Sequence, residues 1–255
     1  MHGCVKFLLC LCLSLNVVLI DAVYAEQALT AVTTEHRLLQ YSENDKLKGP
    51  SAEIFKLLLE KSQLHAPVEF FPWSRAYKTA LERKNTLIFS MVRTQEREDK
   101  FHWLVKVSEL VRGFISLKSR PENYIRNIDD AKTKVIAVLR NSYGFDSLIK
   151  LGFEKNKQLY EVTSIKDGIT LFLSGKVDLF YTDLNVVKNH LASQNKNSDD
   201  IVSIHILPQT RRDSYIAANI DTNSKILAKL KDAANELISD PDYQYHLAYK
   251  PLIDE

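Results

Sequence analysis

The chain has 255 residues, and its 34 Lys and Arg side chains nearly balance 32 Asp and Glu, for a formal net charge of +2. No long basic block is present and the aromatic residues are not interleaved with basic ones, which excludes a nucleic-acid-binding protein. All three cysteines (Cys4, Cys10 and Cys12) precede residue 26, which excludes disulfides, cysteine–metal clusters and cysteine nucleophiles from the rest of the chain.

Residues 1–25 are predicted to be a signal peptide. Lys6 supplies a positive start, residues 7–20 are largely apolar, and Val23 and Ala25 are the small residues that a signal peptidase reads. The apolar stretch is short for a membrane-spanning helix, and an uncleaved anchor is the alternative. Export without disulfides fits the periplasm of a Gram-negative bacterium, with cleavage expected near Ala25.

Short apolar runs alternate with amphipathic segments in the first third of the chain. Ser51 is expected to cap a helix whose apolar face begins at Ile54 and Phe55, and Pro72 opens a second helix. The expected strands are residues 28–33, 68–71 and 87–89. This alternation predicts a parallel α/β layer.

A second α/β unit is expected after residue 112. Its predicted strands are residues 135–139, 177–181 and 201–207, with helices beginning near Asp129, Phe145, Ser164 and Asp183. Residues 111–117 and 214–219 are expected to be strands that cross out of the first unit and back, before a final helix at residues 224–238. The organisation predicted is a discontinuous lobe 1 (residues 26–112 and 218–255) and a continuous lobe 2 (residues 113–217), joined by a hinge.

The most informative stretch is residues 87–103, where an apolar run ends and a charged segment begins. Thr94 is a credible N-cap, and the acidic residues after it favour the positive end of a short helix. Helix-start amides beside Arg93 and Arg97 are suited to receive an anion such as a carboxylate. The alternative is a solvated helix start held by surface ion pairs.

Four segments then line up in order: residues 49–59, 72–77, 90–97 and 175–183. Together they resemble the periplasmic extracellular solute-binding proteins of family 3, the polar amino-acid-binding components of bacterial ABC transporters. The resemblance covers essentially the whole chain after residue 25. It implies an α/β, two-lobe periplasmic-binding-protein fold of type II, with two mixed sheets, flanking helices and a double-strand hinge.

The resemblance also implies roles for individual residues. Arg97 matches the arginine that grips the ligand α-carboxylate, and Asp183 matches the acid that pairs with the α-amino group. Ser142 and Tyr143 occupy the turn that offers hydroxyls and amides, and Ser90 ends the strand before Arg97. The alternatives are a surface ion pair for Arg97 and a plain helix N-cap for Asp183.

The chain departs from the family pattern in ways that affect ligand identity. Tyr41 is the only ring in the loop after the first strand, where Glu35 and Arg37 are either in the cleft or solvated. Arg93 adds a second guanidinium, and Trp73 and Arg75 are candidates to line the pocket. The other predicted ligand-binding residues are Arg97, Ser90, Asp183, Ser142 and Tyr143. A more cationic pocket admits dicarboxylates, acidic amino acids or small peptides.

The function predicted is capture of a small carboxylate-bearing ligand, an amino acid or a relative of one, by hinge closure for an ABC permease. The protein is expected to be a monomer without catalytic residues or a cofactor. No metal is expected, because the seven histidines show no paired metal spacing. Two alternatives stay open. The same fold serves as a ligand-sensing input to a membrane receptor, and a few dehydratases share it and use cleft carboxylates as acid and base.

Overall fold

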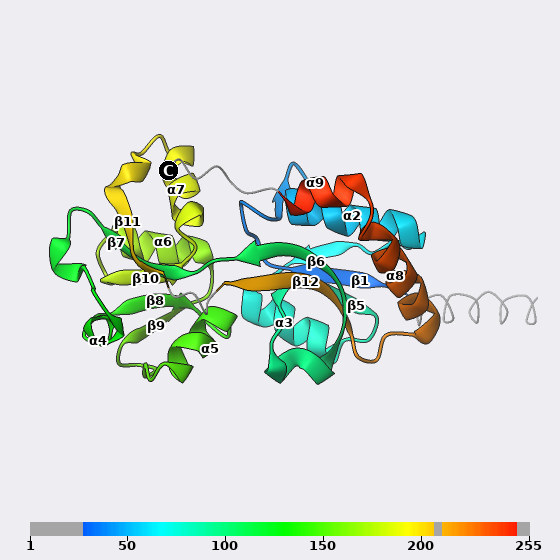
Figure 1. The fold of residues 1–255 in the computed structure, drawn as a ribbon, viewed down its shortest axis with the longest axis horizontal. Coiled ribbons are helices and arrows are strands. Elements are labelled where there is room, and N and C mark those ends of the chain that lie inside the picture. The colour runs from blue at the N-terminus through cyan, green and yellow to red at the C-terminus, as the bar shows by residue number, and fades with distance from the viewer. Residues whose placement is uncertain (1–27, 207–210, 249–255) are drawn as a thin grey trace, which may run out of the picture.

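Two five-stranded sheets form the framework of the computed structural model, which describes residues 28–206 and 211–248 (Figure 1). Each sheet carries helices on both faces, so the protein has two lobes side by side. The predicted signal peptide lies outside the described residues. Within the described ranges, no helix combines the length and apolar character needed to cross a bilayer.

The sheet of lobe 1 has the strand order β4-β1-β5-β12-β6. Strand β1 pairs in parallel with β4 and β5, whereas β12 runs antiparallel to β5 and β6, so the sheet is mixed as predicted. Strand β6 was not predicted, because charged residues interrupt its apolar pattern. The bounds are β1 (Thr30–Thr33), β4 (Val68–Phe70), β5 (Thr86–Val92), β6 (Phe101–Leu110) and β12 (Arg212–Asn219).

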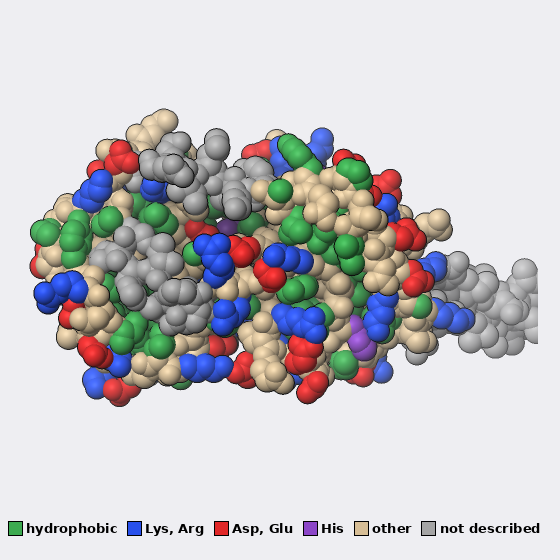
Figure 2. All heavy atoms as spheres, in the orientation of Figure 1, with side chains coloured by type: hydrophobic (Ala, Val, Ile, Leu, Met, Phe, Trp, Pro, Cys, Tyr) green, Lys and Arg blue, Asp and Glu red, His purple; other side chains and the backbone are tan. Residues whose placement is uncertain are grey.

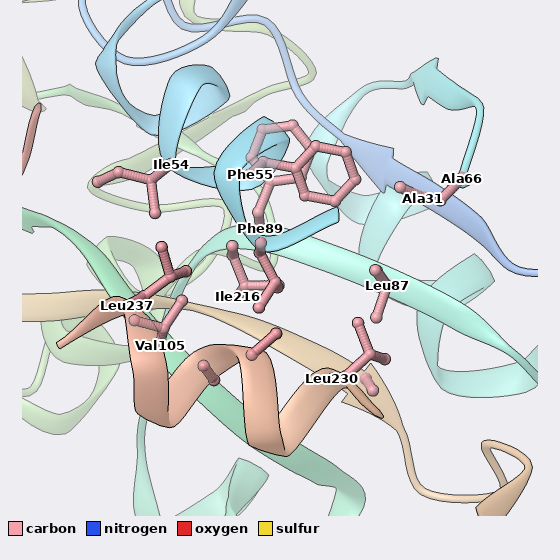
Figure 3. Close-up of a cluster of buried hydrophobic side chains, with 14 of the residues drawn as sticks. Ala31, Ile54, Phe55, Ala66, Leu87, Phe89, Val105, Ile216, Leu230 and Leu237 are labelled. Carbon is pink, nitrogen blue, oxygen red and sulfur yellow. The ribbon is translucent and has the colours of Figure 1, made fainter. Parts of the chain in front are cut away.

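Helices α2 (Pro50–Ser62), α8 (Ser224–Leu237) and α9 (Pro241–Leu247) cover one face of this sheet, and α3 (Trp73–Glu82) covers the other. Figure 3 shows how Phe55 of α2 meets Phe89 of β5, with ring centroids 4.7 Å apart. Leu87 and Phe89 face this cluster while Ile88 faces α3, as the two-residue period of a strand requires. Burial of both faces explains why residues 87–89 of β5 are a continuous apolar run.

The start of α2 corrects one prediction. Ser51 is not the cap: Pro50 occupies the first helical position and Gly49 is the N-cap. Gly49 has φ 106°, and a Cβ at this position would lie 2.4 Å from the carbonyl oxygen of Leu39. Ser51 is instead buried, where its hydroxyl donates to the carbonyl oxygen of Val107 (3.4 Å).

The sheet of lobe 2 has the order β11-β7-β10-β8-β9. Strands β8, β9 and β10 are parallel, and β7 runs antiparallel to β10 and β11. Helices α6 (Ile165–Leu173) and α7 (Leu184–Ser193) pack on one face, and α4 (Ile128–Ala131) and α5 (Tyr143–Lys150) on the other. The strand bounds are β7 (Gly113–Leu117), β8 (Ile136–Leu139), β9 (Leu159–Val162), β10 (Leu179–Thr182) and β11 (Ile201–Ile206).

Smaller elements complete the structure. A hairpin of β2 (Tyr41–Glu43) and β3 (Lys46–Lys48) follows β1. The described residues also form the 3-10 helices η1 (Gln95–Lys100), η2 (Pro121–Asn123) and η3 (Ser198–Asp200). The charged stretch after β5 therefore forms a 3-10 helix with Thr94 at its N-cap, although the Thr94 side chain makes no capping hydrogen bond.

The two lobes are joined where β6 leads into β7 and where β11 leads back to β12 (Figure 1). Strand β12 pairs within the first sheet along its whole length, from Arg212 to Asn219. Figure 2 shows basic and acidic side chains side by side in the middle of the face that Figure 1 presents. Lys106 and Glu109 of β6 form ion pairs with Asp213 and Arg211. The lobe boundaries near residues 112 and 218 stay predictions.

Candidate functional site

Direct hydrogen bonds connect the two lobes. The indole Nε1 of Trp73, at the start of α3, donates to the carbonyl oxygen of Asn141 (2.8 Å). Beside it, the hydroxyl of Ser74 donates to the carbonyl oxygen of Arg140 (3.1 Å). Both acceptors lie in the turn before α5. The two lobes are therefore in contact at this edge, and the Trp73 side chain lies between them.

Arg97 lies at this junction, and it is 5% exposed. Its Nη1 donates to the carbonyl oxygen of Val92 (3.2 Å), which turns the side chain back under β5. The guanidinium also lies over the rings of Trp73 (5.6 Å to the centroid) and Tyr77 (5.0 Å). This burial excludes the exposed surface ion pair considered from the sequence. The carbonyl oxygen of Val92 and the two rings hold the guanidinium in place, and Nη2 faces the other lobe.

The nearest carboxylate to Arg97 comes from lobe 2. Asp146 of α5 is 3.7 Å from Nη2 of Arg97, and about half of the Asp146 side chain is exposed. Burial lowers the pKa of Arg97, and Tyr77 and Asp146 oppose that shift. Burial raises the pKa of Asp146, and Arg97 opposes the shift in turn. Arg97 can thus pair with a carboxylate that approaches from the side of lobe 2.

Ser90 lies in a bulge of β5. Between the pairs Ile88–Ala217 and Met91–Tyr215, β5 advances three residues while β12 advances two. Ser90 takes up the extra residue with φ 61°, in the left-handed region. Its hydroxyl donates to Oε1 of Gln40 (2.6 Å). The bulge directs Ser90 toward the loop after β1, where Gln40 engages it.

A small cavity of about 30 Å³ lies between the lobes and brings together Ser142 and Asp183, two of the predicted site residues. Both are helix N-caps: Ser142 accepts from the amide of Phe145 (3.2 Å), and Asp183 accepts from the amide of Asn185 (2.9 Å). Asp183 is therefore an N-cap that also faces the interlobe space. Burial raises its pKa, against the amide of Asn185 and the charge of Arg112.

A larger groove of about 420 Å³ lies between η1 and α5. Arg93 and Tyr143, two further predicted residues, line it from opposite lobes. Arg93 is bonded to the carboxylate of Glu98, which lowers the pKa of that carboxyl. Tyr143 lies under the guanidinium of Arg212 (5.7 Å). The groove is lined by both signs of charge, including Glu96 and Lys150, which form an ion pair across the lobes.

Five predicted residues line neither hollow: Arg97, Ser90 and Trp73, whose contacts are given above, and Arg75 and Tyr41. Arg75 is exposed and stacks on the ring of Phe71 (4.0 Å). Tyr41 is in the β2–β3 hairpin, where Arg37 lies over its ring (5.3 Å). Arg37 also pairs with Glu35 at 3.1 Å, with more than half of each side chain exposed, so these charges are solvated. Neither Arg75 nor Tyr41 lines the cavity or the groove.

Two basic residues of the small cavity, His36 and Arg112, were not among the predicted site residues. His36 follows β1, and Arg112 sits in the connection from β6 to β7. The available signal for Arg112 was a lone arginine inside an apolar run at a predicted lobe crossing. His36 gave no signal, because its loop was rich in charge. Among the described residues, no group of three His, Asp or Glu side chains is placed to hold a metal.

No protein-family model and no curated protein sequence matches the chain. Solved structures do match. The sensor domain of a histidine kinase with similarity to periplasmic binding proteins has a TM-score of 0.74 at 12% identity, over 86% of this chain and 94% of that one. The arginine-, lysine-, histidine-binding protein ArtJ from Geobacillus stearothermophilus gives 0.72 at 18%, over 89% and 98%.

An ancestral arginine-binding protein bound to arginine gives a TM-score of 0.73 at 19% identity, over 86% of this chain and 96% of that one. Likeness at these identities establishes the fold and no more. The chain has the two-lobe periplasmic-binding-protein fold, so the predicted fold class is confirmed. Membership of family 3 stays a prediction.

Proposed function

We propose that the protein binds a small carboxylate-bearing ligand between its two lobes and closes around it. The single observation that supports this most is Arg97, a buried arginine whose guanidinium is oriented by Val92 and two aromatic rings at the lobe junction. Arginine suits the role because its fork bonds both oxygens of a carboxylate and keeps its charge when buried.

Binding would require the lobes to separate. The cavity between them holds about 30 Å³, room for about two water molecules. A ligand would therefore enter an open form, and its carboxylate would take the side of Arg97 that Asp146 faces in the closed form. Closure would then bring the two lobes together around the ligand. Ligand energy would shift the balance between the open and closed forms.

The role we favour is delivery of the ligand from the periplasm to an ABC permease, by a monomeric protein. Two of the matched structures are named as binding proteins for amino acids, which supports this role. A second role, sensing for a membrane receptor, draws support from the matched sensor domain of a histidine kinase. Genes for a permease and an ATPase beside this one would favour import, and a kinase gene would favour sensing.

The test is isothermal titration calorimetry against amino acids, dicarboxylates and hydroxy acids, with Arg97→Ala. Leaving a buried ligand carboxylate unpaired costs on the order of 3 kcal/mol, so the Kd should rise more than 100-fold. Arg83→Ala is the matched control, because Arg83 pairs with Glu69 on an exposed part of lobe 1. Unchanged affinity in Arg97→Ala would show that the ligand does not use this site.

A further inference from the structure

Arg112 is one of the two basic residues of the interlobe cavity that were not predicted from the sequence. Its side chain passes the start of α5: a Cβ added to Gly144 would lie 3.2 Å from Cδ of Arg112, 3.4 Å from its Nε and 3.4 Å from the hydroxyl of Ser142. Arg112 and Asp183 both line the cavity. A guanidinium therefore shares the space in which Asp183 was expected to meet a ligand ammonium group.

Electrostatics indicate that these two groups are already coupled. Burial lowers the pKa of Arg112, while Tyr181 and Asp183 oppose the shift. Burial raises the pKa of Asp183, and Arg112 opposes that shift. Each charge thus favours the ionised form of the other. The negative charge of Asp183 is balanced within the protein, and a ligand ammonium beside it would also sit beside a buried guanidinium of the same sign.

The remaining polar side chains of the cavity are uncharged. His36 is neutral at pH 7, because burial, and then the charge of Arg112, lower its pKa to about 4. Its Nδ1 is buried and makes no hydrogen bond to any group in the described part of the chain. Ser142 presents a hydroxyl. These groups suit a hydroxyl or carbonyl oxygen on the ligand, which neither repels Arg112 nor requires a free carboxylate.

We propose that Arg112 is a specificity-determining residue, and that the pocket prefers a 2-hydroxy or 2-oxo carboxylate to the α-amino acid of the same skeleton. The ligand carboxylate lies on Arg97, and its neighbouring oxygen faces Arg112 and His36. Asp183 offsets the charge of Arg112, so a ligand ammonium group beside the pair would be an additional positive charge, whereas a ligand oxygen atom would not. The inference rests on the proposed carboxylate-binding function and narrows its ligand class.

Matched ligand pairs test this on the wild-type protein. Calorimetry would compare L-lactate with L-alanine, L-malate with L-aspartate, and L-2-hydroxyglutarate with L-glutamate, since each pair differs only in hydroxyl against ammonium. The hydroxy acid should bind at least tenfold more tightly in the pair that binds best. A wild-type protein that binds the amino acid as tightly or more tightly overturns the inference.

Variants locate the preference. Arg112→Gln should reduce the ratio within the best pair to less than threefold, and Arg112→Lys, which keeps the charge, should retain a preference for the hydroxy acid. Arg126→Gln is the matched control, because Arg126 is an exposed arginine of lobe 2 paired with Asp130. A preference that survives in a folded Arg112→Gln overturns the role of Arg112. If Arg112→Gln loses its cooperative thermal transition and is therefore unfolded, the test uses the ligand-pair affinities of the wild type and of Arg112→Lys instead.

The two proposals fail in different ways. If the protein binds the amino acids more tightly and loses that affinity in Arg97→Ala, the proposed ligand class is wrong but the carboxylate site is supported. If Arg97→Ala leaves the Kd of the bound hydroxy acids or amino acids unchanged, the carboxylate site and this inference are both overturned. The same holds if no member of the three pairs binds.

Discussion

Removal of one hydrogen bond between the lobes should open the unliganded protein. Trp73→Phe keeps most of the buried ring and deletes the bond from Nε1 to the carbonyl oxygen of Asn141 (2.8 Å). A hydrogen bond of this kind contributes about 1 kcal/mol net. The ratio of closed to open forms should therefore fall about 5-fold.

Single-molecule fluorescence transfer measures this ratio directly. All three cysteines precede residue 26, so a chain without the predicted signal peptide accepts dyes only at Lys78→Cys and Lys157→Cys, exposed positions in lobes 1 and 2. Trp103→Phe is the matched control, because Trp103 donates to the carbonyl oxygen of Glu98 (3.3 Å) within lobe 1. The same distance distribution for Trp73→Phe, Trp103→Phe and the wild type would refute the reasoning.

Three further predictions concern stability, each measured by urea or thermal unfolding. Gly49→Ala should cost ~2 kcal/mol, because φ is 106° and the new Cβ would lie 2.4 Å from the carbonyl oxygen of Leu39; an unchanged melting temperature would contradict this. The pKa of His36 falls from 6.5 to about 4 in the fold, so the protein should lose up to about 3 kcal/mol as pH falls from 6.5 to 4, and His36→Gln should lose less over that range. Ser214→Ala should lower the free energy of unfolding by roughly 1–3 kcal/mol, because the buried hydroxyl of Ser108 loses its partner at 2.6 Å. The double variant Ser108→Ala/Ser214→Ala should recover part of that loss. Additive losses from the two single variants would contradict a coupling between the hydroxyls.

Much of the fold could be predicted because its signals are local. Ser142, Ser164 and Asp183 each precede an amphipathic segment, and each caps the helix that was expected there. Local signals failed where long-range contacts decide the structure. Strand β6 has polar and charged residues between its apolar ones, and it becomes a strand because β12, more than a hundred residues later, supplies its ladder of hydrogen bonds.

The candidate site divides in the same way. The sequence by itself determined that Arg97 follows a buried strand and that Asp183 begins a helix, because strand ends and caps are read within a few residues. Only the tertiary structure decided that Arg97 is buried against Trp73 and Tyr77, and that Arg112 lines the same cavity as Asp183. Burial and charge pairing depend on which elements the fold places together, and no short stretch of sequence contains that information.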